Sequence, residues 1–155
     1  MREGMRVGYS AGAFDLFHVG HLNLLRQAKA HCDYLIAGVV SDELLQSKKG
    51  ITPIVPLAER LEIVRHISFV DEAVPEVHTD RIDTWRETPF DVFFKGDDWR
   101  GTPSGLALEK QFAEVGVEVV YFPYTLSTSS TQLRRALATL SGSPAEAASA
   151  RGGRR

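Results

Sequence analysis

The sequence contains a single cysteine, Cys32, so its 155 residues cannot form an internal disulfide. It has no apolar run long enough to cross a bilayer. Neither sign of charge dominates, and the formal net charge of -2 gives no overall basic field for nucleic acid or an anionic membrane. The first four residues lead directly into a strand pattern, which predicts no signal peptide. We therefore expect a cytoplasmic protein with no nucleic-acid or membrane partner.

What the sequence does contain is typical of one globular domain. Its apolar fraction of 43% and charged fraction of 25% are ordinary for such a domain. A chain of this length buries roughly two-thirds of its unfolded surface, which is enough for a core. From Ser141 onward the residues are mostly Gly, Ser, Ala, Pro and Arg. We expect one domain over residues 1–140 and a disordered tail over residues 141–155.

Apolar strand patterns alternate with amphipathic helical patterns along the whole domain. Strands are expected over residues 5–10, 33–40, 69–77, 90–95 and 117–122. Helices are expected over residues 18–31, 42–48, 57–68, 79–87, 103–115 and 131–140. This order predicts an α/β fold, a Rossmann-like three-layer sandwich with a five-stranded, mostly parallel sheet and right-handed crossovers.

Three loops that follow predicted strands carry the polar residues of interest. They span residues 12–21, 96–99 and 123–130. Because ligands of parallel sheets bind beyond the carboxyl ends of the strands, we expect these loops to converge on one crevice.

Two histidines, His18 and His21, flank Gly20 where the first strand gives way to the first helix. Unpaired amides and the helix dipole make such a helix start a site for phosphate. The imidazoles could donate hydrogen bonds to phosphoryl oxygens as pyrophosphate leaves, and Gly20 lets the backbone approach closely. A zinc site is a weaker alternative, because one cysteine and no clustered acids leave too few ligands nearby.

The segment G-A-F-D-L-F-H-V-G-H at residues 12–21 resembles the H-x-G-H signature of the nucleotidyltransferase superfamily. It is most similar to the cytidylyltransferase branch, and nearest to glycerol-3-phosphate cytidylyltransferases. Residues 32–35 followed by residues 41–43 resemble the second strand and helix of that family, and residues 69–72 resemble its third strand. Residues 96–99 resemble its G-D-D-W loop, and residues 125–131 resemble its late I-S-T-T segment. The likeness covers roughly residues 5–138 in the family's order, which is stronger than any lone motif.

The resemblance implies a role for particular residues. The residues implied in catalysis are His18, His21 and Lys48. The residues implied in nucleotide binding are Ala13, Phe14, Asp15, Gly20, Asp97, Asp98, Ser129, Ser130 and Thr131. The residues implied in substrate binding are Lys48, Arg60 and Tyr124. The family also implies Mg²⁺, or another divalent cation, and a homodimer.

Several of these residues have an ordinary structural interpretation as well. Asp97 and Asp98 could hold a metal, or accept from a ribose hydroxyl or a cytosine amino group, or form a plain acidic turn. The hydroxyl run before the last helix also suits an N-cap. Lys48 and its neighbour Lys49 are expected in a flexible loop after the second helix. For Lys49, a solvent-exposed charge without a binding role is the favoured interpretation. Arg60 is expected either to bind phosphate or to pair with Glu59 or Asp71.

Two positions depart from the pattern of the glycerol-3-phosphate enzymes. Ala13 stands where those enzymes have Thr, and Tyr124 stands where they have an arginine. Both changes remove an expected phosphate contact, so they concern chiefly the second substrate.

The resemblance, together with these patterns, implies an enzyme that transfers CMP from CTP to a small phosphorylated alcohol. The best candidate for the acceptor is sn-glycerol 3-phosphate, which would give CDP-glycerol and pyrophosphate. One alternative is an adenylyltransferase that uses ATP on a heptose phosphate, pantetheine phosphate or FMN. Another is a nucleotide-binding module without turnover. The G-D-D-W loop favours CTP, and the two histidines favour turnover.

Overall fold

A computed structural model of the protein describes residues 3–123 and 129–142. Its centre is a sheet of five parallel strands in the order β3-β2-β1-β4-β5. The strands are β1 (Val7–Gly12), β2 (Tyr34–Val40), β3 (Glu72–Glu76), β4 (Val92–Gly96) and β5 (Glu118–Phe122). The helices are α1 (Val19–Ala30), α2 (Asp42–Lys49), α3 (Leu57–Arg65), α4 (Arg81–Glu87), α5 (Pro103–Ala113) and α6 (Ser130–Ser141), with a 3₁₀ turn η1 (Asp97–Trp99) after β4. The predicted α/β fold is confirmed, and every pairing in the sheet is parallel.

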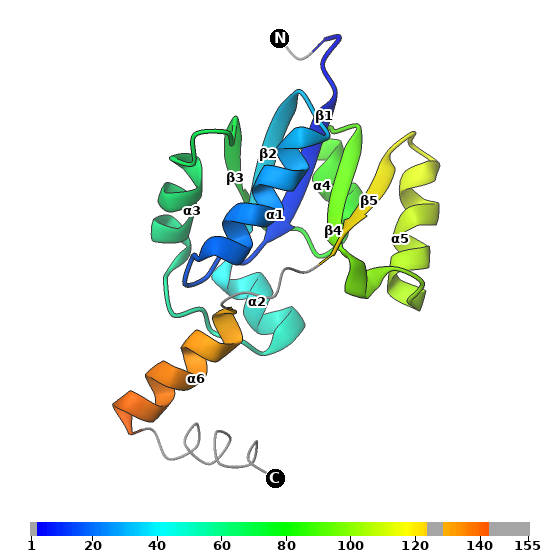
Figure 1. Ribbon diagram of the computed structural model, residues 1–155. Coiled ribbons are helices and arrows are strands. Elements are labelled where there is room, and N and C mark those ends of the chain that lie inside the picture. The colour runs from blue at the N-terminus through cyan, green and yellow to red at the C-terminus, as the bar shows by residue number, and fades with distance from the viewer. Residues whose placement is uncertain (1–2, 124–128, 143–155) are drawn as a thin grey trace.

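Helices cover both faces of the sheet and make three layers (Figure 1). On one face, Leu25 and Ala28 of α1 and Val64 of α3 pack on β2 and β4. On the other face, Ile82 of α4 and Phe112 of α5 pack on the central strands. The sheet is buried on both sides, which explains why β2 is an almost continuous apolar run.

The strand order reverses at β1, whose neighbours are β2 on one side and β4 on the other. After β1 the chain builds the sheet outward to β3, and it then returns to lay β4 on the free side of β1. The connections that follow β1 and β4 therefore leave the sheet in opposite directions, which opens a crevice at their carboxyl ends. The loops after Gly12 and Gly96 lie at this crevice.

The helix boundaries follow local capping chemistry. The hydroxyl of Ser41 accepts from the amide of Leu44 at the start of α2, and Gly50 adopts a left-handed conformation at its end. Lys48 and Lys49 therefore lie in the last turn of α2, which ends one residue after the expected helix over residues 42–48. The expectation of a flexible loop at these two lysines is wrong. Cations there complement the helix dipole, which gives a physical reason for the longer helix.

The third strand is shorter than the expected range, because it begins only at Glu72. Phe69 and Val70 pack against the core from the turn before it. Pro75 is accommodated because β3 is an edge strand.

Helix α6 extends away from the sheet, beyond the end where β1 meets α1 (Figure 1). Its outward side chains include Leu137 and Leu140. In the part of the chain that the structure describes, no helix has the length and apolar character needed to cross a membrane.

Candidate active site

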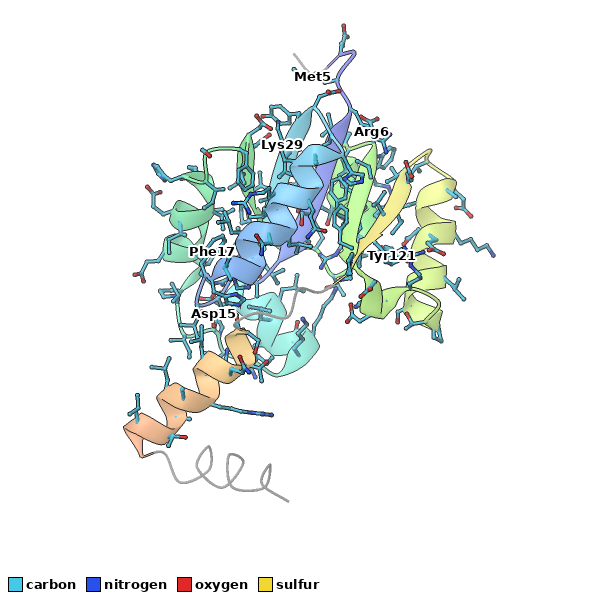
Figure 2. The ribbon with its side chains drawn as sticks, viewed as in Figure 1. Met5, Arg6, Asp15, Phe17, Lys29 and Tyr121 are labelled. Atoms are coloured by element: carbon cyan, nitrogen blue, oxygen red, sulfur yellow. The ribbon has the colours of Figure 1, made fainter. Side chains whose placement is uncertain are left out.

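The turn between β1 and α1 has an unusual backbone. Phe14 and Leu16 have positive φ angles of 53° and 52°, a conformation that non-glycine residues seldom adopt. The Phe14 ring is buried in the core, and Asp15 between the two is almost fully buried as well. Figure 2 shows Asp15 and Phe17 at the end of α1 that faces the first turn of α6.

His18 and His21 cap the start of α1 reciprocally. The Nδ1 atom of His18 accepts from the Gly20 amide at 3.1 Å, and the Nδ1 atom of His21 accepts from the His18 amide at 3.2 Å. Because both Nδ1 atoms are acceptors, each neutral ring carries its proton on Nε2. The ring centroids are 4.0 Å apart, so two Nε2–H donors lie side by side at the positive end of a helix.

The surroundings keep both imidazoles neutral near pH 7. Burial lowers the pKa of His18, and burial together with the neighbouring His18 lowers the pKa of His21 to about 4. Neutral rings can still donate from Nε2, and they leave the site without a fixed repulsion between two imidazolium ions. The arrangement suits recognition of an anion that develops charge during a reaction.

The last helix brings its hydroxyls to the same place. Ser130 Oγ donates to the Asp15 carbonyl at 2.7 Å and lies 3.3 Å from His18 Nε2. Ser129 is the N-cap of α6 and accepts from the Gln132 amide, while Thr131 is exposed in the first turn. Two helix N-termini, those of α1 and α6, thus meet at His18 despite a sequence separation of 112 residues. The predicted convergence of the first and last loops is confirmed for Ser130 at the end of the last loop, whereas residues 124–128 lie outside the described residues.

The Asp15 side chain has three partners within the fold, and its predicted contact with a nucleotide stays a prediction. Its carboxylate accepts from the amides of Ile54 and Val55 at 2.8 and 2.9 Å and from Arg134 at 2.9 Å. Burial alone raises the pKa of Asp15, but these three hydrogen bonds outweigh it and hold the pKa below its usual value. Asp15 therefore joins the turn between β1 and α1 to helix α6 and to the segment before α3.

The predicted substrate-binding role of Arg60 is corrected. Its side chain is completely buried, and it donates to the carbonyls of Ala13, Val40 and Val55. Its charge is paired with Asp42 at 2.5 Å, whereas the expected partner Asp71 pairs with Lys29. A guanidinium with these partners has no face left for a substrate phosphate.

The G-D-D-W loop forms η1 at the carboxyl end of β4. Asp97 and Asp98 are both exposed there. Trp99 is half-buried, and the ammonium of Lys95 lies 3.9 Å from the centre of its indole ring. The role of the two acids toward a nucleotide stays a prediction.

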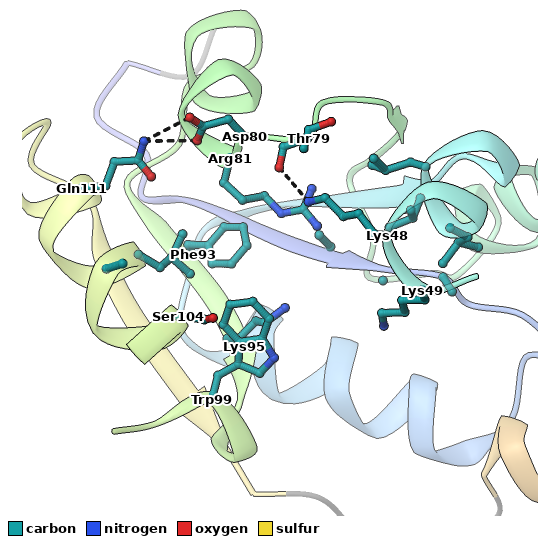
Figure 3. Close-up of a pocket in the computed structure, with 18 residues that line it drawn as sticks. Lys48, Lys49, Thr79, Asp80, Arg81, Phe93, Lys95, Trp99, Ser104 and Gln111 are labelled. Carbon is teal, nitrogen blue, oxygen red and sulfur yellow. Dashed lines mark hydrogen bonds between the residues drawn. The ribbon is translucent and has the colours of Figure 1, made fainter. Parts of the chain in front are cut away.

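A cationic pocket of about 480 Å³ opens beside this loop (Figure 3). It is lined by the ends of β1, β2 and β4 and by side chains of α2, α4 and α5. Four of its side chains are cationic, namely Lys48, Lys49, Arg81 and Lys95. Lys48 points into it and donates to the Thr79 carbonyl at 2.6 Å. Burial, followed by the neighbouring Arg81, lowers the pKa of Lys48.

The pocket and the histidine pair meet at the turn after β1. Ala13 lines the pocket, and the chain runs from it through Phe14 to His18. Gly20 lies in the first turn of α1, on the histidine side. Tyr124 falls outside the described residues, so its predicted role as a substrate contact stays a prediction.

Three cations of this region are absent from the expected set. Lys95 and Arg81 line the pocket, and Arg134 reaches Asp15 beside the histidines. Lys95 is the last side chain of an apolar strand, directly before the G-D-D-W loop, so the rule for strand ends could have identified it. The same rule could not have identified Arg134, because the sequence of α6 does not indicate which part of the fold the helix packs against.

Among the described residues, no group of three or more His, Cys, Asp or Glu side chains is arranged so that it could hold a metal ion. Mg²⁺ is commonly held by substrate phosphates, water and only one or two carboxylates. The exposed carboxylates of Asp97 and Asp98 could supply the one or two protein ligands of such an ion.

Comparison with known proteins agrees with this geometry. A family model described as "Cytidylyltransferase-like" matches residues 9–136. Glycerol-3-phosphate cytidylyltransferase of Bacillus spizizenii is 37% identical over 131 residues, which cover 83% of this chain and 95% of that protein. FAD synthase of Thermococcus sibiricus is 32% identical over 116 residues, which cover 74% of this chain and 78% of the relative.

A solved structure supports the fold. The lipopolysaccharide core biosynthesis protein of Thermoplasma volcanium superposes with a TM-score of 0.67 at 25% identity, over 81% of this chain and all of that chain. The family match covers β1 from Tyr9 onward, the other four strands, the histidine pair and the first turn of α6. The chain therefore belongs to the cytidylyltransferase-like family and is a nucleotidyltransferase.

Proposed function

We propose that the protein transfers CMP from CTP to a small phosphorylated alcohol, with sn-glycerol 3-phosphate as the first candidate. The likeness to a glycerol-3-phosphate cytidylyltransferase over 95% of that relative carries the proposal. A second observation supports it: a pair of Nε2–H donors and a cationic pocket meet at one turn, as a reaction between two anionic substrates requires.

In the proposed reaction, a phosphate oxygen of the acceptor attacks the α-phosphorus of CTP. The new P–O bond joins acceptor phosphate and CMP, and the bond from the α-phosphorus to the β-phosphate oxygen breaks to release pyrophosphate. The attacking oxygen is already anionic, so no general base is required. His18 and His21 donate from Nε2 to the phosphoryl oxygens on which charge develops, and the amides at the start of α1 bind the same phosphates.

Mg²⁺ belongs to the proposal as an ion carried by the triphosphate. When bound, it would screen the charge of the phosphates. Asp97 and Asp98 are the residues that would hold it from the protein side. A homodimer, as implied by the family resemblance, also remains a proposal, which light scattering on the purified protein tests.

Pyrophosphate release tests the function directly. The purified protein is incubated with CTP, MgCl₂ and a panel of phosphorylated alcohols that includes sn-glycerol 3-phosphate and ethanolamine phosphate. Release that requires both CTP and one acceptor is the expected result. Binding of CTP without release for any acceptor would favour the module without turnover.

The FAD synthase relative keeps an ATP-dependent reaction as the second candidate. Thermal shifts with CTP and ATP at equal concentrations separate the two. Stabilisation by ATP alone would replace CTP in the proposal, and FMN and a heptose phosphate would then be the acceptors to assay.

A further inference from the structure

Phe17 directly precedes His18, the N-cap of α1, and the proposed reaction makes no use of it. Its ring is half-buried and packs against the core cluster on the α1 face of the sheet. The centre of this ring lies 5.3 Å from the centre of the His21 imidazole, and the two ring planes are tilted by 34°. Figure 2 shows Phe17 at the end of α1 where the histidines begin the helix. The phenyl ring of Phe17 therefore covers part of the His21 imidazole.

A second aromatic ring completes these surroundings. Phe14 is almost fully buried, and its ring meets the His21 imidazole edge-on with the ring centres 5.7 Å apart. The rings of Phe14 and Phe17 are themselves 6.3 Å apart, within the range of aromatic contacts. The imidazole of His21 thus has two phenyl rings as neighbours where a surface histidine would have water.

The backbone before Phe17 shows that its place is set by the fold. Phe14 and Leu16 are both left-handed, with φ angles of 53° and 52°. Non-glycine residues keep this unfavourable conformation only where surrounding contacts hold it, and such residues cluster at functional sites. One such contact comes from α6, because Ser130 Oγ donates to the Asp15 carbonyl at 2.7 Å. The turn that presents Phe17 to the histidines is therefore held by a distant part of the chain.

The capping hydrogen bond of His21 requires a neutral imidazole. Its Nδ1 atom accepts from the His18 amide at 3.2 Å. An imidazolium carries a proton on both ring nitrogens, so it has no atom left to accept this bond. A protonated His21 would lose the bond and turn its ring, and the Nε2–H donor would move with it. For His21, staying neutral and staying in place are the same requirement.

The charged groups around His21 are few, and two of them offset each other. His18 lies beside it at the start of α1, Asp15 lies in the preceding turn, and Arg134 approaches from α6. Asp15 raises the pKa of His21 and Arg134 lowers it, while these two side chains are paired with each other at 2.9 Å. Burial is the largest cause of the lowered pKa, ahead of His18. The covering rings are therefore the part of the surroundings that matters most.

We propose that Phe17 is a positioning residue whose ring excludes water from His21 and keeps its imidazole neutral in the capping orientation. The role of His21 in turnover rests on the proposed function, whereas the titration and tautomer of its ring do not depend on turnover. Leucine at this position would still exclude water by its bulk, and alanine would admit it. Phe17→Leu and Phe17→Ala are therefore the pair of variants that separates the two cases.

NMR titration of the histidine rings tests the proposal without catalysis. The ¹⁵N shifts of the imidazole nitrogens report the tautomer and the pKa together. In the wild type, His21 should carry its proton on Nε2 and stay neutral down to about pH 5, because its pKa is about 4. Phe17→Ala should raise this pKa toward the ordinary value of about 6.5, and it should raise that of His18 by less. Phe17→Leu should keep most of the depression.

The pH dependence of turnover is the second readout. Pyrophosphate release gives kcat/KM, which reports the free protein, and the ratio of variant to wild type cancels the titration of the acceptor's own phosphate. This ratio should fall about tenfold between pH 7 and pH 5 for Phe17→Ala, because the exposed ring becomes protonated, and it should stay level for Phe17→Leu. Phe69→Ala is the matched control, since it removes another half-buried ring from the same core cluster, one that lies beside Arg26. Its ratio should not change with pH.

The contrary outcomes are distinct. Thermal unfolding identifies any variant that fails to fold, and the wild-type titration then decides: a His21 that carries its proton on Nδ1, or that titrates near pH 6.5, overturns the proposal. An unchanged His21 titration in folded Phe17→Ala overturns it as well. If the titration shifts as expected while no acceptor yields pyrophosphate, the effect of Phe17 on His21 stands and the proposed transferase reaction is what fails.

Discussion

His18 and His21 carry their donors on Nε2 because backbone amides occupy both Nδ1 atoms. This tautomer follows from helix capping, so the fold prepares the site before any ligand binds. Each ring is neutral at pH 7 since burial lowers its pKa. The site can therefore donate hydrogen bonds without storing repulsion between two positive rings.

Replacing His21 tests this role. We expect His21→Ala to lower kcat about 10²- to 10³-fold, because a donor to the developing charge is lost. Pyrophosphate release measures the effect, and thermal unfolding checks that the domain still folds. His66→Ala is the matched control, because that imidazole is exposed at the end of α3. Near-normal turnover of His21→Ala would remove His21 from the mechanism.

Lys95 gives the cationic pocket a dependence on pH. Burial, reinforced by Arg81 and Lys49, lowers the pKa of Lys95 to about 8. The ammonium is thus charged below pH 8 and loses its proton as the pH rises above it. We expect kcat/KM for the acceptor to fall above about pH 8 in the wild type and to stay level in Lys95→Arg, because a guanidinium does not titrate there. If kcat/KM falls equally steeply above pH 8 in both proteins, the fall is caused by the titration of a group other than Lys95.

At the scale of elements, Asp15 connects the turn between β1 and α1 to two later segments of the chain. It accepts from the amides of Ile54 and Val55 and from Arg134 of α6, residues 39, 40 and 119 positions away. Through these contacts it holds the N-terminus of α6 beside His18. The carboxylate that the family motif places next to the histidines thus organises the site through contacts within the fold.

Asp15→Asn should loosen this connection. We expect a loss of roughly 2–4 kcal/mol in the free energy of unfolding, because one amide and Arg134 lose a charged partner in a buried place. Urea denaturation at pH 7 measures it, with the exposed Asp83→Asn as control. Since the folded pKa of Asp15 lies below its unfolded value, its contribution is present above about pH 4 and is lost as the pH falls further. The difference between wild type and variant should shrink accordingly, and an undiminished difference in acid would refute the assignment.

At the scale of the whole molecule, the reversal of strand order at β1 places the loops after β1 and β4 at one crevice. The core on each face is complete within the described residues, and α6 ends with Gly142 in a left-handed cap. The packing that supports the site is thus in place before residue 143.

A shortened chain tests the predicted domain boundary. We expect residues 1–142 to unfold within a degree or two of the full chain and to release pyrophosphate within about twofold of its rate, because the removed residues have the composition of a chain that builds no core. A full chain heated under the same conditions is the reference. A large loss of stability or activity would show that residues 143–155 belong to the domain.

The sequence by itself determined the alternation of strands and helices, the parallel sheet and the place of the histidine pair. These depend on local patterns: buried runs such as β2, helix caps such as Ser41, and the motif around Gly20. Because residues next to one another on the chain form these elements, no tertiary contact is needed to recognise them.

Only the tertiary structure decided what Asp15, Arg60, Glu76 and Arg81 do. Arg60 reaches carbonyls 20 and 47 positions away, and Glu76 receives the hydroxyl of Tyr9 from 67 positions away. The sequence presents each of them simply as a charge near a motif. Whether such a charge is buried with partners or left facing a pocket depends on which strands become neighbours, and that is a property of the assembled sheet.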